Sequence, residues 1–159
     1  MEEKTKTLTF TAAKAKAMQY CAYQERSQQE VRDKLYAWGL HREEVENVLT
    51  ELILENFLNE ERFAIAYAGG KHRVNKWGRH KIKQGLKLKA VSAPLIRTAL
   101  NSLDEAEYLQ NLQELLDKKA TSLPETDPYK RRQKLVNYVL SKGYESDLIF
   151  ETLNDKDLQ

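Results

Sequence analysis

The side chains best suited to chemistry gather in the basic segment HRVNKWGRHKIKQGLKLK, residues 72–89. From Ala64 to Leu103 the chain has no Asp or Glu, and the acidic residues that follow, beginning with Asp104, reverse the sign of the charge. Clustered cations bind phosphate groups or an acidic protein surface, and a solvated helix face is the alternative interpretation. The candidate partner- or DNA-binding residues are Lys71, Arg73, Lys76, Arg79, His80, Lys83 and Lys87.

A helix through this segment would bring several of the cations onto one surface. With Ile82 and Leu86 facing inward, a turn of about 100° per residue places four of them along one flank and the outer face: Arg79, His80, Lys83 and Lys87. Lys81 then projects to the other side, toward Trp77. An indole can stack on a base or anchor a partner, but we interpret Trp38 and Trp77 as packing residues between helices.

The other reactive residue types do not assemble into a catalytic or metal site. His72 and His80 are not on the spacing of about four residues that puts two imidazoles on one metal ion. Gly69 and Gly70 lack the Lys and Ser/Thr that follow in a phosphate-binding loop. Cys21 is the only cysteine, so no disulfide can form within the chain, and we place it in the core. We therefore expect no metal, no cofactor and no enzymatic activity.

The elements that must position the cations form an internal repeat. Three segments superimpose without a gap, at intervals of about fifty residues. They are VRDKLYAWGLHREEVENVL (31–49), IKQGLKLKAVSAPLIRTAL (82–100) and LVNYVLSKGYESDLIFETL (135–153). Apolar residues four apart indicate two short helices in each copy, around a turn at Gly39, Ala90 and Gly143. Because Ala tolerates a left-handed backbone less well than Gly, we expect the middle turn to differ in shape.

Helix-capping signals support the same division. Ser27 with Glu30 forms a capping box, Asp127 precedes Pro128, and Ser92 precedes Pro94. A further helix precedes each pair. The first covers about 11–25, the second follows Asn59 with a stripe of Phe63, Tyr67, Gly70 and Val74, and the third carries Tyr108, Leu112 and Leu115 or Leu116.

The sequence thus predicts an all-α protein of three tandem three-helix repeats, residues 11–57, 58–103 and 104–155. Units this small bury little surface alone, so we expect them to join into an elongated, curved array. Charged residues make up 31% of the chain, and no apolar run approaches membrane-spanning length. We expect a cytoplasmic monomer with no membrane association.

The run LNEERFAIAYAGGKHRVNKWGRHKIKQGL, residues 58–86, resembles the signature of the RecX regulatory proteins. The matching positions are Arg62, Phe63, Ala64, Tyr67, Gly78, Lys81, Ile82 and Leu86. The first copy adds SQQEVRDKLYAWG and the third adds KLVNYVLSKGY, so the similarity spans about residues 11–153. Arg62 serves either a partner or a structural salt bridge.

This resemblance implies a negative regulator of the RecA recombinase. Members of the family consist of tandem three-helix repeats that lodge in the groove of the RecA–single-stranded-DNA filament. They block its extension or promote its disassembly, which lowers ATPase, strand-exchange and co-protease activity in DNA repair, recombination and the SOS response. Some members also bind single- or double-stranded DNA, weakly and with a dependence on salt.

The alternative is a helix-turn-helix-like DNA-binding protein that acts without RecA. Three-helix units with a basic second helix fit it loosely. The helix after Ala90, however, has Arg97 as its only ionic residue, so it lacks the base-reading side chains of a recognition helix.

Overall fold

The computed structural model describes residues 8–156, and all regular secondary structure within them is α-helical. The helices are α1 (Phe10–Tyr23), α2 (Gln28–Ala37), α3 (Arg42–Leu54), α4 (Glu60–Asn75), α5 (Arg79–Leu88), α6 (Ala93–Asn101), α7 (Glu105–Ser122), α8 (Pro128–Ser141) and α9 (Ser146–Lys156). None of these helices is long and apolar enough to cross a membrane. The all-α prediction is confirmed, and the first helix is shorter at its C-terminal end than expected.

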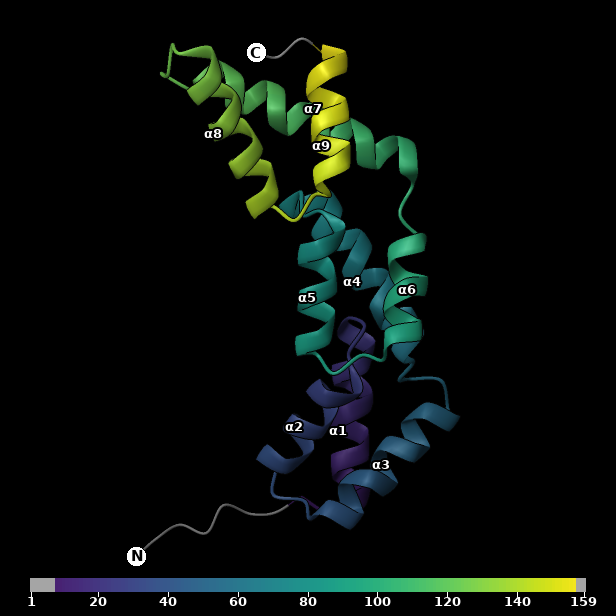
Figure 1. The fold of residues 1–159 in the computed structure, drawn as a ribbon. Coiled ribbons are helices and arrows are strands. Elements are labelled where there is room, and N and C mark those ends of the chain that lie inside the picture. The colour runs from purple at the N-terminus through teal and green to yellow at the C-terminus, as the bar shows by residue number, and fades with distance from the viewer. Residues whose placement is uncertain (1–7, 157–159) are drawn as a thin grey trace, which may run out of the picture.

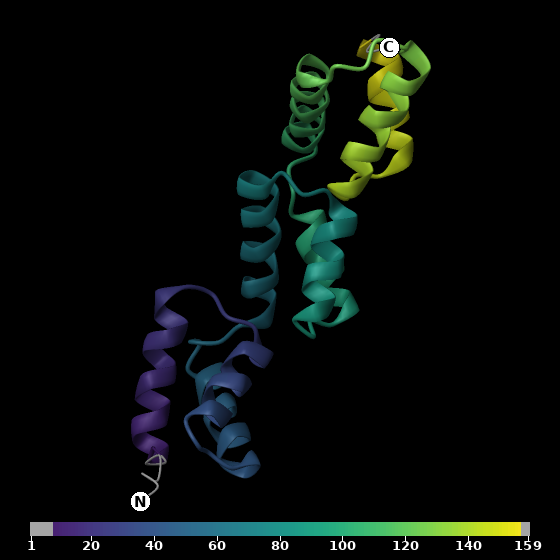
Figure 2. The ribbon, with the colours of Figure 1, turned by 90° about the vertical axis from the view of Figure 1, so that its left-hand side faces the viewer.

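The helices group into three units, each with its own core, and the units stack end to end into an elongated molecule (Figures 1 and 2). Unit 1 contains α1–α3, unit 2 contains α4–α6, and unit 3 contains α7–α9. Buried side chains of each unit pack on one another, for example Leu35 with Val48, Ile82 with Leu86, and Leu135 with Ile149. Stability therefore comes from three small cores and from the two junctions between them.

The predicted capping residues begin their helices. Ser27 Oγ accepts the backbone N–H of Glu30 at 3.0 Å, while the Glu30 carboxylate accepts the N–H of Ser27 at 3.1 Å. Asn59 caps α4 through the N–H of Arg62, and Asp127 caps α8. Ser92 is the N-cap of α6, but its side chain makes no capping hydrogen bond.

The middle turn has the same shape as the other two, so the prediction that it differs is wrong. Gly39, Ala90 and Gly143 all have positive φ, at 91°, 60° and 100°. The same two backbone hydrogen bonds close each turn, as in the N–H of Val91 to the carbonyl of Leu86 and the N–H of Ala90 to that of Lys87. The flanking helices therefore determine the conformation, and Ala90 bears the steric cost of its Cβ.

The stripe predicted on the helix after Asn59 only partly faces the core. Ala64 and Ala68 are fully buried and His72 nearly so, and they form the inner face of α4 with Phe63. Val74, at the far end of the stripe, is 81% exposed. The stripe therefore leaves the core and continues onto the surface.

Candidate functional site

The outer face of α5 presents unpaired cations. Ile82 and Leu86 are fully buried on its inner side, and His80, Lys83 and Lys87 are exposed on the opposite side. Neither Lys83 nor Lys87 takes part in any ion pair recorded for residues 8–156. Their ammonium groups are therefore available to a phosphate or a carboxylate of a partner. We call His80, Lys83 and Lys87 the α5 basic face.

A second cationic cluster surrounds Trp77, which packs against the core of unit 2. The ammonium groups of Lys71 and Lys81 each lie 4.9 Å from the centroid of the indole ring. Such cation–π contacts hold long side chains in place while leaving their charge accessible. The expected position of Lys81 near Trp77, and the packing role of Trp77, are confirmed.

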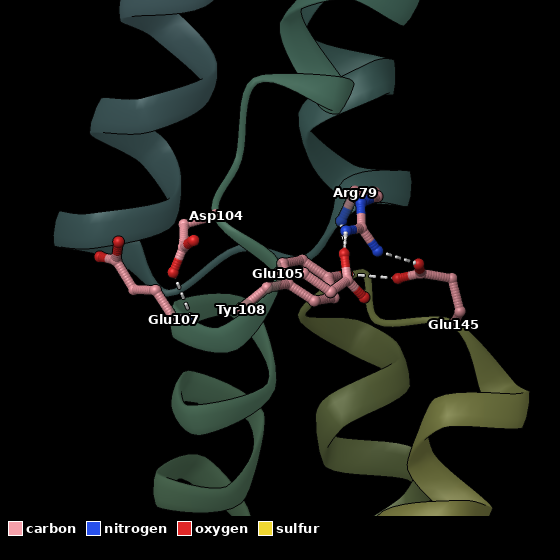
Figure 3. A network of polar contacts seen from close by, with 6 residues as sticks. All are labelled: Arg79, Asp104, Glu105, Glu107, Tyr108 and Glu145. Carbon is pink, nitrogen blue, oxygen red and sulfur yellow. Dashed lines mark hydrogen bonds and ion pairs between the residues drawn. The ribbon is translucent and has the colours of Figure 1, made fainter.

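Arg79 belongs to an ion-pair network at the junction of units 2 and 3 (Figure 3). Its guanidinium donates to Glu145 at 2.7 Å and to Glu105 at 2.5 Å, and it lies 3.9 Å from the ring centroid of Tyr108. Tyr108 accepts the backbone N–H of Arg79 at 3.0 Å and donates its hydroxyl to Glu145. Arg79 therefore joins two units. Unlike Lys83 and Lys87, it is paired with carboxylates of its own chain.

A buried polar chain extends this junction. His72 is 2% exposed, and its Nδ1–H donates to the carbonyl of Trp77 at 2.9 Å. Its Nε2 accepts from the side-chain amide of Asn111 at 2.8 Å, and Lys76 donates to the amide oxygen of Asn111 at 3.3 Å. The His72 ring also stacks on Tyr108 with centroids 5.1 Å apart. Two candidate cations, Lys76 and Arg79, thus help to hold units 2 and 3 together.

The backbones of the two units also meet directly, at Gly78 and Gly143. The N–H of Gly78 donates to the carbonyl of Lys142 at 2.7 Å, and the N–H of His80 donates to that of Gly143 at 2.9 Å. A Cβ on Gly78 would overlap the backbone of Gly143 and Tyr144. Close backbone approach explains why glycine occupies this signature position.

Most other signature residues support the fold or the junction of units 1 and 2. Arg62 donates to Glu25 at 2.5 Å and to the Asn56 side chain at 3.2 Å, so it makes a structural salt bridge across that junction. The hydroxyl of Tyr67 lies over Gly85, where a Cβ would collide with it. Phe63, Ala64, Ile82 and Leu86 are core residues.

Sequence reasoning missed Tyr108, Asn111, Glu105 and Glu145 as partners of the basic segment. Glu145 lies 66 residues from Arg79, so no local pattern connects them. The one sequence signal that could have indicated these partners is the change from basic to acidic residues after Leu103, since Glu105 is one of those acidic residues. Arg73 is exposed, and its guanidinium folds back over Gly69.

Within the described residues, no group of three or more His, Cys, Asp or Glu side chains is placed to hold a metal ion. Cys21 is buried in the core of unit 1, and burial raises the pKa of its thiol above the ordinary value. A protonated, enclosed thiol is a packing group rather than a nucleophile.

Three-helix units stacked end to end, with a basic helix in the middle unit, define a helical-repeat protein. Three family models match it: the first three-helix domain of RecX over residues 13–52, the second over 59–100 and the third over 105–153. The chain belongs to the RecX family of regulatory proteins.

Relatives extend this similarity over nearly the whole chain. Regulatory protein RecX of Clostridium perfringens is 32% identical over 149 residues, covering 92% of this chain and 69% of that protein. Regulatory protein RecX of Clostridium acetobutylicum is 31% identical over 150 residues, with the same coverage. The crystal structure of RecX from Lactobacillus salivarius has the same fold, with a TM-score of 0.85 at 23% identity, covering 94% of this chain and 97% of that one.

Proposed function

We propose that this protein is a non-catalytic regulator of the RecA recombinase. It binds the RecA–single-stranded-DNA filament and inhibits filament extension, ATPase activity and strand exchange, in DNA repair, recombination and SOS control. The observation that carries the proposal is the match of all three units, in order, to the three domains of the RecX family.

The shape and the charge of the molecule suit this role. A rod of three units can contact more than one subunit of a filament, so that many modest contacts add up. The α5 basic face lies on the middle unit, and its lysines can pair with carboxylates of RecA or phosphates of the DNA it wraps. In this proposal the protein acts as a monomer in the cytoplasm, and any direct contact with DNA is weak and salt-dependent.

Lys83 and Lys87 are better positions than Arg79 for testing the contact with RecA. Replacing Arg79 would break the junction of units 2 and 3 as well as any partner contact, whereas Lys83 and Lys87 stand clear of the core. The variant of choice is therefore Lys83→Gln with Lys87→Gln. Two exposed charge contacts of about 0.7 kcal/mol each correspond to about a tenfold weaker inhibition of RecA ATPase activity on single-stranded DNA.

The matched control replaces two exposed lysines outside the α5 basic face, Lys118→Gln with Lys130→Gln. It removes the same charge and should inhibit RecA as the unaltered protein does. Equal inhibition by the Lys83/Lys87 variant would remove the α5 basic face from the contact. Failure of the unaltered protein to inhibit RecA at any concentration would reject the proposal itself.

A DNA-binding protein that acts without RecA is the competing function. The helix in the position of a recognition helix, α6, carries Arg97 as its only ionic residue, which weighs against sequence-selective binding. Tight, sequence-selective binding to duplex DNA in the absence of RecA would favour this alternative, and weak binding that falls steeply with salt would not.

A further inference from the structure

An apolar groove lies between the end of α1 and the outer side of α4, away from the residues of the α5 basic face. Its volume is about 410 Å³, and α4 lines it with Phe63, Ala66, Tyr67, Gly70, Lys71 and Val74. Gln24 and Glu25, which follow α1, line it from the other side. These α4 residues include the whole stripe that runs from the core onto the surface. The stripe therefore begins at Phe63 in the core of unit 2 and ends at Val74 on the surface.

The groove remains open because Gly70 has no side chain. A Cβ built on Gly70 would meet no atom within 4 Å, other than those of its own helix and its neighbours. Glycine is not required there by the backbone, since Gly70 lies within a regular helix and its φ is not positive. The glycine costs helix stability, and a large side chain at this position would occupy the open space above it.

The charge around the groove is positive. Lys71, at its edge, lies 5.5 Å from the ring centroid of Tyr67 and 4.9 Å from that of Trp77, with Lys81 beyond on the same indole. Neither lysine is in any ion pair recorded for the described residues. The one carboxylate at the groove, Glu25, is already paired with Arg62. An apolar floor beside unpaired lysines complements an apolar side chain flanked by carboxylates.

We propose that this groove binds a short acidic segment of a partner protein, with one large apolar side chain seated over Gly70 and its carboxylates on Lys71 and Lys81. A protein segment fits better than a nucleic acid, because Phe63, Ala66 and Val74 give the lining an apolar surface for a side chain and Lys71 is the only cation among the lining residues, whereas a nucleic acid is bound through several cations along its backbone. The volume is near the small end of the range of about 300–1,000 Å³ for binding pockets, which suits one anchoring side chain. The site goes beyond the proposed function, because it is separate from the α5 basic face and does not depend on RecA as the partner.

The test uses a display library of short random peptides, selected on the full chain and counter-selected on Gly70→Met. Methionine at this position fills the groove from a helix that tolerates it, so circular dichroism and the Tm should show an intact or more stable fold. The expected result is enrichment of peptides with Asp or Glu around one aromatic or leucine residue. Such peptides should bind Gly70→Met at least about tenfold more weakly by fluorescence anisotropy, and should weaken as salt is raised.

Two variants serve as matched controls. Asn137→Met adds the same side chain to an exposed position of α8, and Lys130→Gln removes an exposed charge there; both should bind the selected peptides as the unaltered protein does. Lys71→Gln should weaken binding without changing the Tm. The proposal is overturned if no peptide is enriched, if the enriched peptides are neutral or basic, or if Gly70→Met binds them equally well. It is also overturned if an oligo-dT strand occupies the groove, seen as a loss of oligonucleotide binding in Gly70→Met.

Discussion

At the scale of single residues, the three equivalent turns differ in the residue that has the positive φ angle. Gly39 and Gly143 adopt a left-handed backbone without steric cost, whereas Ala90 adopts it with a Cβ. A left-handed L-residue is disfavoured by about 1–2 kcal/mol. The middle unit carries this strain because its helices and their closing hydrogen bonds match those of its neighbours.

Ala90→Gly should therefore stabilise the protein, by about 0.5–1 kcal/mol once the greater freedom of glycine in the unfolded chain is included. Urea denaturation at neutral pH measures this change. The reciprocal variant, Gly39→Ala, should destabilise unit 1 by about 1 kcal/mol or more. If Ala90→Gly lowered stability, the left-handed angle would not be a source of strain.

At the scale of helices, the residues that begin them differ in how much they stabilise the fold. Ser27 is fully buried and takes part in a complete capping box at the start of α2. Ser92 occupies the same place before α6, but it is exposed and its side chain makes no capping hydrogen bond. Comparing the two serines therefore distinguishes the effect of the capping hydrogen bond from the effect of having serine at the N-cap.

Ser27→Ala should lower the free energy of unfolding by about 1–2 kcal/mol, because it leaves the N–H of Glu30 without its acceptor. Ser92→Ala should change it by only a few tenths of a kcal/mol. Thermal and urea denaturation of the two variants side by side provide the measurement. Equal effects of the two substitutions would contradict the assignment of the capping box.

At the scale of the whole molecule, the junction of units 2 and 3 joins two units that have separate cores into one elongated molecule. The hydroxyl of Tyr108 connects the two units, since it accepts from the backbone of Arg79 and donates to Glu145. Burial, and next the hydrogen bond to Glu145, raise the pKa of Tyr108 above its ordinary value of 10.0. Burial likewise raises the pKa of Tyr144, whose hydroxyl donates to the carbonyl of Lys76.

These raised pKa values predict a loss of stability at alkaline pH. Below pH 10 both the folded and the unfolded chain hold the Tyr108 proton, so its contribution is fully present. Above pH 10 the unfolded chain releases the proton and the folded chain retains it, so stability falls by about 1.4 kcal/mol per pH unit for each such group.

Tyr108→Phe should reduce that slope, so that the loss of stability between pH 9 and 11 becomes about 1.4 kcal/mol smaller in total in urea denaturation, although the variant is less stable at neutral pH. Tyr129→Phe is the matched control, because Tyr129 is 77% exposed, and it should leave the slope unchanged. A slope that does not respond to Tyr108→Phe would mean that this hydroxyl ionises in the folded protein as readily as in the unfolded chain.

Much of the fold was predictable because its signals are local. Apolar spacing located the helix pairs around Gly39, Ala90 and Gly143, and capping residues such as Ser27 and Asn59 located helix starts. The position of Lys81 near Trp77 followed from helical geometry alone. The shape of the middle turn was not predictable from Ala90, because neighbouring helices impose it.

The candidate site was only partly predictable, because a cation's partners depend on distant parts of the chain. Periodicity placed Lys83 and Lys87 on the outer face of a helix, where they lie. It placed Arg79 with them, but the end-to-end stacking of units 2 and 3 brings Glu145 and Glu105 to its guanidinium. The groove over Gly70 could not be foreseen, since it requires the end of α1 beside α4.

The sequence by itself determined the helices, their capping, the threefold repetition and the family, since each depends on residues close together along the chain or on a matched motif. Tertiary structure alone decided which cations remain free, which hold the units together, and where an apolar stripe becomes a groove. The physical reason is that charge pairing and burial depend on distance in space, and the packing of one unit on the next sets that distance.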